Sequence, residues 1–160
     1  MLRSSLTALA LLVTMAPASA QRGGGDMSLG ISPMQLSRLE RLELVFKLDK
    51  DQKKAVKAIF DEAHQTAATP RKELATTRAV LGQAVIAARP QAEIDAAVKA
   101  YGIPAAAMAK IEMQALGDML KGLTPEQRQN GAAVRTAFSM VRGMFLDEKK
   151  WDKIPEAQGY

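Results

Sequence analysis

Cysteine is absent from the 160-residue chain, and histidine occurs once. Without a thiol the protein has no disulfide, no thiolate metal ligand, no cysteine nucleophile and no lipidated cysteine anchor. Aromatic residues make up only 4% of the chain, which argues against a nucleic-acid module that stacks bases on a basic surface. The formal net charge of +5 suits attraction to acidic or partly folded polypeptides instead.

Patterns typical of an active site are also missing. There is no Gly-rich phosphate loop and no serine-nucleophile motif, and the carboxylates alternate with Lys and Arg as on solvated helix faces. We therefore expect neither enzyme activity nor a cofactor. His64 follows Asp61 by three residues, but two ligands do not close a metal site, so His64 is only a weak metal candidate. Methionine thioethers could hold Cu(I), but Met108, Met119 and Met144 fall at core positions, which favours a gap-filling role.

Long hydrophobic runs are lacking as well. The apolar stretch from Leu6 to Met15 is well short of the about 20 residues that a membrane-spanning helix needs, and Pro17 ends it. It follows the charged Arg3 and precedes Ala18-Ser19-Ala20, the small-residue pattern of a cleavage site. We therefore expect residues 1–20 to be a cleaved signal peptide and the mature protein to be exported and soluble. The glycine-rich residues 21–32 should form a flexible arm.

Apolar residues recur at helical spacing, and no segment shows the sustained alternation of a strand, so we predict an all-α domain over residues 33–146. Ser32-Pro33 is a helix start signal. A second helix should begin at Asp49 and end at Arg89-Pro90. Pro70 lies inside it, but the apolar register continues, so we favour one kinked helix over two separate helices. The first stripe is Leu36, Leu39, Leu42 and Phe46; the second core face is Phe60, Ala67, Leu74, Leu81 and Ala88, with Val56, Ala63, Ala84 and Val85 beside it.

Two further helices complete the prediction. The third runs from Gln91 to Lys121, with a kink or brief break at Gly102-Ile103-Pro104, and Gly122 is its candidate C′ residue. Residues 147–160 should be a polar tail, although Trp151 could dock locally. The core positions of the third helix are Ile94, Tyr101, Met108 and Ala115, and those of the fourth are Val134, Ala137, Phe138, Val141, Met144 and Phe145.

A short motif occurs twice, as LDKDQ at 48–52 and LTPEQ at 123–127. Thr124 can accept the backbone N–H of Gln127, and the Gln127 side chain can reach back to the N–H of Thr124, which makes a capping box. Asp49 and Gln52 take the same two places in the first copy. The residue after each glutamine is basic, so no hydrophobic staple forms and the motif leucines should pack on a neighbouring helix. The motif residues with a structural capping role are Leu48, Asp49, Gln52, Leu123, Thr124 and Gln127.

On these motifs, the signal peptide and the helix plan, the chain resembles the Spy/CpxP (LTXXQ-motif) family of periplasmic proteins over about residues 32–145. It is also similar to small helical heavy-metal-resistance proteins. The copy at 123–127 matches the motif fully, whereas the copy at 48–52 departs from it at Asp49. The resemblance implies a four-helix antiparallel fold, usually paired into a cradle-like homodimer, with chaperone or envelope-stress roles. The Cys- and His-rich metal motifs of some relatives are missing here.

We therefore expect an ATP-independent holdase or refolding chaperone that binds unfolded or partly folded proteins on a curved helical surface. The alternative is a sensory module in which metal or misfolded protein changes its contact with a membrane-bound partner. Basic side chains would steer clients to the surface. The client-binding candidates are Lys50, Lys53, Lys54, Lys57, Arg71 and Arg78.

Overall fold

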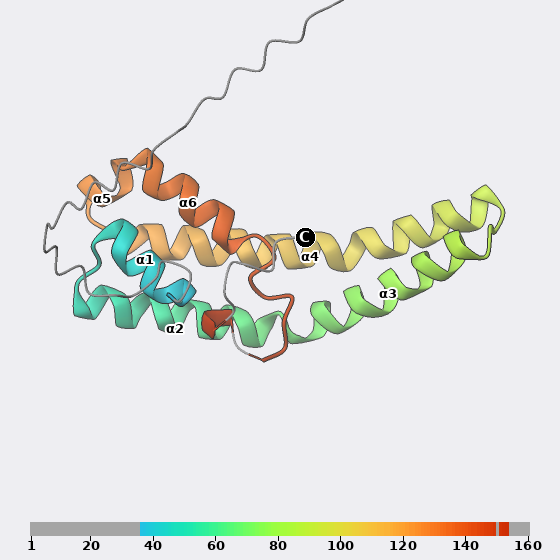
Figure 1. The fold of residues 1–160 in the computed structure, drawn as a ribbon, viewed down its shortest axis with the longest axis horizontal. Helices are drawn as coiled ribbons and strands as arrows, with labels where there is room; N and C mark the ends of the chain where they lie inside the picture. The colour runs from blue at the N-terminus through green and yellow to red at the C-terminus, as the bar shows by residue number, and fades with distance from the viewer. Residues whose placement is uncertain (1–35, 150, 154–160) are drawn as a thin grey trace, which may run out of the picture. The chain divides into compact units, whose positions relative to one another are not determined.

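The computed structural model describes residues 36–149 and 151–153, so the expected signal peptide and flexible arm lie outside the described residues. The described part folds into α-helices and one short 3₁₀ helix and has no strand (Figure 1), which confirms the all-α prediction. No helix within it is both long and apolar enough to cross a bilayer. The elements are α1 (Arg38–Phe46), α2 (Lys50–Thr66), α3 (Ala68–Ile86), α4 (Gln91–Lys121), α5 (Pro125–Gln129), α6 (Gly131–Val141) and η2 (Trp151–Lys153).

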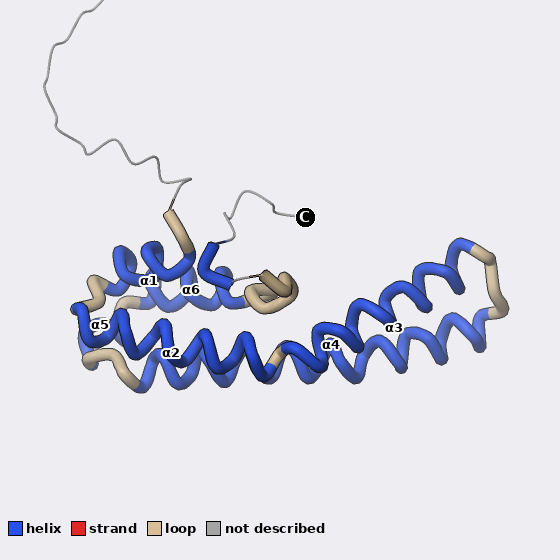
Figure 2. Tube along the Cα trace, turned by 90° about the horizontal axis from the view of Figure 1, so that it is seen from below, coloured by secondary structure: helices blue, strands red, loops and turns tan. Residues whose placement is uncertain are grey.

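The helices form a long hairpin with a second layer over one part of it. The first arm of the hairpin is α2 followed by α3, and the second arm is α4, which packs antiparallel to both. α1 and α6 pack together on the portion formed by α2 and α4 (Figure 2). The remainder of the hairpin, α3 with the first half of α4, has no helix of the described part laid over it. There are six α-helices in this part where four were expected, because two of the predicted helices are divided.

The first division lies at Pro70. Proline has no backbone N–H and cannot supply the helical bond to the carbonyl of Thr66. The helix is interrupted at Ala67, which nevertheless keeps right-handed helical backbone angles (φ −71°, ψ −9°), and Arg71 N–H bonds to its carbonyl at 2.9 Å. Ala67 is also fully buried. The chain therefore continues in the same direction past Pro70, but as two helices where one kinked helix was favoured. The core face is kept through Ala67, whereas Val85 and Ala88, expected on it, are exposed.

The prediction for α4 is accurate at both ends, Gln91 and Lys121, but the brief break that it allowed in the interior is absent. The helix is uninterrupted at Pro104, a buried residue, where a kink or brief break was expected. Gly122 was expected to be a left-handed C′ residue, but its backbone is right-handed (φ −77°). Its N–H bonds to the carbonyls of Met119 at 3.1 Å and Asp118 at 3.4 Å. The helix therefore ends in a tightened last turn and not in a left-handed cap.

The predicted fourth helix is the second one to be divided. Asn130 leaves helical angles (φ −71°, ψ 85°), and its side chain accepts the N–H of Ala133 at 3.1 Å, so it starts α6 as a new helix. Met144 and Phe145 lie in turns beyond α6 and are fully buried there. Phe138, expected in the core, is 46% exposed, and Met140 is buried instead.

The start of the first helix also differs. α1 begins at Arg38, with Ser37 as its N-cap and Glu40 completing a capping box. The Ser32-Pro33 signal lies outside the described residues. Ser37 and Glu40 have the spacing of a capping box, so the sequence contains a second start signal, four residues after the Ser-Pro pair.

Trp151 belongs to the core although it was predicted within a polar tail. It is 2% exposed, and its ring centroid lies 5.0 Å from that of Phe60 on α2. Phe60 also faces Phe145 at 6.2 Å, so one aromatic cluster joins α2 to the chain beyond α6. Such tilted pairs add about 0.5–1.5 kcal/mol to the burial of the rings themselves.

Candidate functional site

The two motif copies come together at one end of the hairpin. Both form the predicted capping boxes: Asp49 accepts the N–H of Gln52 at 2.8 Å, and Thr124 accepts that of Gln127 at 3.3 Å. Each glutamine accepts in return from its own cap residue, at 3.2 Å and 2.9 Å respectively. Leu48 is 8% exposed and sits in the core cluster with the other motif leucine, as expected without a hydrophobic staple.

The glutamine side chains also bind each other, which the sequence analysis missed. Gln52 Nε2 donates to Gln127 Oε1 at 2.9 Å, and Gln127 Nε2 donates to Gln52 Oε1 at 3.1 Å. Each amide then reaches the chain just before the other motif: Gln52 to Gly122 O at 3.4 Å, and Gln127 to Phe46 O at 3.0 Å and Lys47 O at 3.4 Å. The motifs are thus one hydrogen-bonded unit that fastens the start of α2 to the start of α5.

Beyond α6 the chain forms a segment that we call the strap, residues 143–149 with Trp151. Charged or polar side chains from four helices hold it. Glu112 accepts the N–H of Gly143 at 2.8 Å, and Asp61 accepts the indole N–H of Trp151 at 2.9 Å. Arg38 donates to the carbonyls of Met144 at 3.1 Å and Trp151 at 3.3 Å. The strap is therefore fixed mainly through its backbone.

Arg71 is, with Glu112, one of the two buried charged anchors, although it was a client-binding candidate. It is 8% exposed, and its Nη1 donates to the carbonyls of Phe145 at 2.9 Å and Asp147 at 2.6 Å. The same nitrogen lies 2.9 Å from Nε2 of His64. Its guanidinium is thus occupied by partners inside the protein.

Burial changes the acid–base behaviour of the anchors. Burial raises the pKa of Glu112, against the hydrogen bond from Gly143 and the charges of Arg142 and Arg38. Burial likewise lowers the pKa of the Arg38 guanidinium. Burial alone would raise the pKa of Asp61, but hydrogen bonds from Lys57 and Trp151 bring it below its ordinary value. These shifts are consistent with anchors that are desolvated but paired.

The sequence did hold a signal for two of these anchors. Glu112 lies four residues after Met108 and three before Ala115, on the apolar face of α4, where a carboxylate without a partner would be costly. Arg71 lies four residues after Ala67 and three before Leu74, beside the apolar face of α3. A charge at such a place on a helix indicates a buried partner elsewhere in the fold.

The four lysines lie on the first two turns of α2, but two of them are paired. Lys53 forms a salt bridge with Glu43 of α1, and Lys57 forms one with Asp61 at 2.5 Å. Lys50 and Lys54 are exposed. The positive patch predicted from sequence is therefore weaker than the number of lysines suggests.

A different surface lies on the uncovered part of the hairpin. Arg71, Arg78 and Val85 follow one another at intervals of seven on α3, as Val98, Ala105 and Glu112 do on α4, so each set shares one face of its helix. Since Arg71 and Glu112 both bind the strap, we call this side of the hairpin the strap face.

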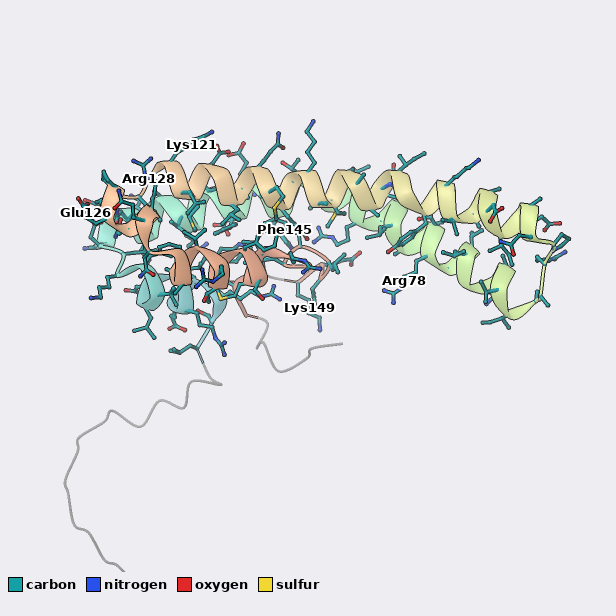
Figure 3. The ribbon with its side chains drawn as sticks, turned by 90° about the horizontal axis from the view of Figure 1, so that it is seen from above. Arg78, Lys121, Glu126, Arg128, Phe145 and Lys149 are labelled. Carbon is teal, nitrogen blue, oxygen red and sulfur yellow. The ribbon has the colours of Figure 1, made fainter. Side chains whose placement is uncertain are left out.

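Arg78 is the candidate residue that this face does present. Its side chain points to the side of the hairpin on which Phe145 and Lys149 of the strap lie (Figure 3). It lines an open cavity of about 470 Å³ where the strap meets the uncovered hairpin. Lys50 is 28 positions earlier, roughly 40 Å along the helices, so the structure does not bring the lysines and Arg78 together. The cavity is lined by Arg71, Leu74, Ala75, Arg78, Ala79, Tyr101, Leu146 and Glu148.

Apolar side chains are unusually exposed along this uncovered part. Val85 is 57% exposed on α3 and Val98 is 49% exposed on α4, both on the strap face. Single exposed apolar residues are ordinary, but several on one short hairpin indicate a surface that meets another molecule. The large apolar residues concerned are Val80, Val85, Ile86, Val98 and Ile103.

No metal-binding group is formed by His, Asp and Glu within the described residues. His64 lies against Arg71, a permanent cation that disfavours a bound metal ion. Met108, Met119 and Met144 are buried in the core, as their positions predicted. Met113 is exposed at 36%.

Comparison with known proteins gives no relative: no family model, no curated protein and no solved structure matches this chain.

Proposed function

We propose that this protein is a periplasmic, ATP-independent chaperone of the Spy/CpxP type that binds partly folded proteins on the strap face. The observation that carries the proposal is the exposed apolar surface of the uncovered hairpin, which includes Val85, seven residues after the cavity-lining Arg78, and Val98, three residues before the cavity-lining Tyr101. A holdase needs an apolar surface that stays in water without collapsing. The α3–α4 pair supplies one, because the two helices pack along each other and no second layer covers them.

Arg78 and the lysines of α2 serve this function in different ways. Arg78 lies inside the apolar surface, where a guanidinium can bind a client carboxylate while its stem covers apolar groups. Lys50 and Lys54 lie roughly 40 Å away and act on the rate of encounter only. On the resemblance to the Spy/CpxP family we also propose that the protein forms a homodimer, in which the strap faces of two copies would bind one client.

Suppression of client aggregation without ATP tests the proposal. The purified protein should suppress aggregation of a chemically unfolded, acidic client, and the V85S/V98S variant should need several-fold more protein for the same effect. Leu44 is 68% exposed on α1 and does not line the cavity beside Arg78, so L44S is the matched control and should behave as the wild type.

Two results would reject the proposal. The first is no suppression by the wild-type protein at any ratio to client. The second is an equal loss in L44S and V85S/V98S, which would show that the strap face has no special role. Calorimetric titration with divalent metals and Cu(I) is a separate measurement. Tight metal binding together with absent suppression would favour the sensory alternative.

A further inference from the structure

The cavity where the strap meets the uncovered hairpin has walls from both of them. Leu74, Ala75 and Ala79 of α3 line it on the hairpin side, and Leu146 of the strap lines it on the other. Ala75 and Ala79 are one turn apart on the same helix face, so two small side chains stand where larger ones would fill the space. The volume, about 470 Å³, is in the range of sites that hold small organic molecules.

Two polar groups at this cavity have no partner in the part of the chain that the structure describes. Arg78 makes neither a hydrogen bond nor a salt bridge there, and the hydroxyl of the half-buried Tyr101 makes no hydrogen bond. Both groups can donate. Arg71 also lines the cavity, but its Nη1 already donates to the carbonyls of Phe145 and Asp147. Arg78 is therefore the cation that a ligand in the cavity can reach.

These donors select the charge of a ligand. A guanidinium binds a carboxylate through two parallel hydrogen bonds, and the Tyr101 hydroxyl can donate to the same group. Glu148 lines the cavity from the strap and forms no salt bridge with Arg78 or any other described residue. Its negative charge opposes a phosphate or a dicarboxylate, which would bring a second negative charge to the site. The charges therefore fit a ligand with a single carboxylate.

The rest of the lining selects the body of the ligand. The remaining side chains, of two leucines and two alanines, are aliphatic. A sugar or a nucleotide would lose water from its polar groups along these walls without gaining hydrogen bonds. Beyond the cavity the strap face is still apolar at Val85, which is 57% exposed about two turns after Arg78. A hydrocarbon chain longer than the cavity would therefore stay on apolar surface.

We propose that this cavity binds an aliphatic monocarboxylate of the fatty-acid class, with its carboxylate on Arg78 and Tyr101 and its hydrocarbon chain between α3 and Leu146 of the strap. The inference does not depend on chaperone activity, because the cavity can hold such a ligand whether or not the protein binds clients. A bound ligand would compete with any client that uses Arg78.

Calorimetric titration of the purified protein with decanoate tests the site. We expect saturable binding to one site per chain. Decyltrimethylammonium has the same chain with the opposite charge, and it should bind at least about 10-fold more weakly. Octanoate is two methylenes shorter and should bind about 3- to 10-fold more weakly, because the open cavity covers only part of each methylene. All three ligands are used below the concentrations at which they form micelles. Absence of saturable decanoate binding, or equal affinity for decyltrimethylammonium, overturns the proposal.

Two variants locate the binding site. R78Q removes the guanidinium of an exposed residue, so it should fold as the wild type does and bind decanoate about 5- to 20-fold more weakly. Arg135 is exposed on α6 and does not line the cavity, so R135Q is the matched control and should bind decanoate as the wild type does. Equal weakening in both variants, or none in R78Q, would show that decanoate binds elsewhere and would reject the site.

Discussion

Replacing Gln127 with alanine tests whether the two motifs act as one unit. The Gln127 side chain makes four hydrogen bonds of 3.1 Å or less: it accepts from Thr124 N and Gln52 Nε2, and it donates to Phe46 O and Gln52 Oε1. Each such bond contributes about 0.5–1.5 kcal/mol net, and the site is partly open to water, which can replace some of them. We expect Gln127→Ala to lower the free energy of unfolding by about 2–3 kcal/mol.

That loss exceeds the value of an ordinary cap, which is about 1 kcal/mol. Urea unfolding followed by far-UV circular dichroism gives the number. Arg128, the next residue on α5, is exposed and supplies the control: Arg128→Ala should stay within about 0.5 kcal/mol of the wild type.

A double-mutant cycle then isolates the bond between the glutamines. Gln52→Ala removes the same two mutual hydrogen bonds, so the double variant should cost less than the sum of the single variants by about 1–2 kcal/mol. Additive losses, or a cost for Gln127→Ala near that of a simple cap, would refute the reasoning. Each glutamine would then be only a local capping residue.

Three further predictions concern the strap and the charged surface. Glu112→Gln should flatten the pH dependence of stability. Because the pKa of Glu112 is raised in the folded state, the folded protein binds more protons than the unfolded chain above about pH 4.5, so the stability of the wild type falls as the pH rises through that range. Urea titrations at several pH values should show no such fall in the variant. Trp151→Ala should cost about 3 kcal/mol in urea unfolding because it empties the space over Phe60, and a loss under about 1 kcal/mol would mean that the strap frays in solution. Replacing Lys50 and Lys54 with Gln should slow association with an acidic client several-fold in stopped-flow measurements while leaving the dissociation rate unchanged. High salt should have the same effect on the wild-type protein, and an unchanged association rate in the variant would refute electrostatic steering.

Local rules in the sequence determined the helical class and most helix ends. The limits of α4, the bend at Pro70 and the caps at Asp49 and Thr124 depend on interactions within a few residues, so a single chain segment contains all the information they need. The apolar register of α2 was equally reliable, because Val56 and Phe60 lie on one helical face.

Predictions failed where a neighbouring element competes with the local pattern. Asn130 caps a new helix in a stretch whose apolar spacing fits one continuous helix, because the chain turns there to lay α6 on α1 and α4. Met144 and Phe145 keep their spacing but reach the core from turns. Apolar spacing identifies candidates for burial, of which Phe138 is exposed, and it does not show whether the backbone between them is helical.

Only the tertiary structure decided the candidate sites. The pairing of Gln52 with Gln127 joins residues 75 positions apart, and Arg71 reaches the strap across 76. A capping glutamine looks the same in sequence whether or not a partner comes near. The place of Arg71 beside the apolar face of α3 indicates that a partner exists, but it does not say which distant residue that partner is. The exposure of Val85 and Val98 also follows from where the strap ends. The sequence determines which residues can be buried or paired, and the packing of distant elements determines which of them are.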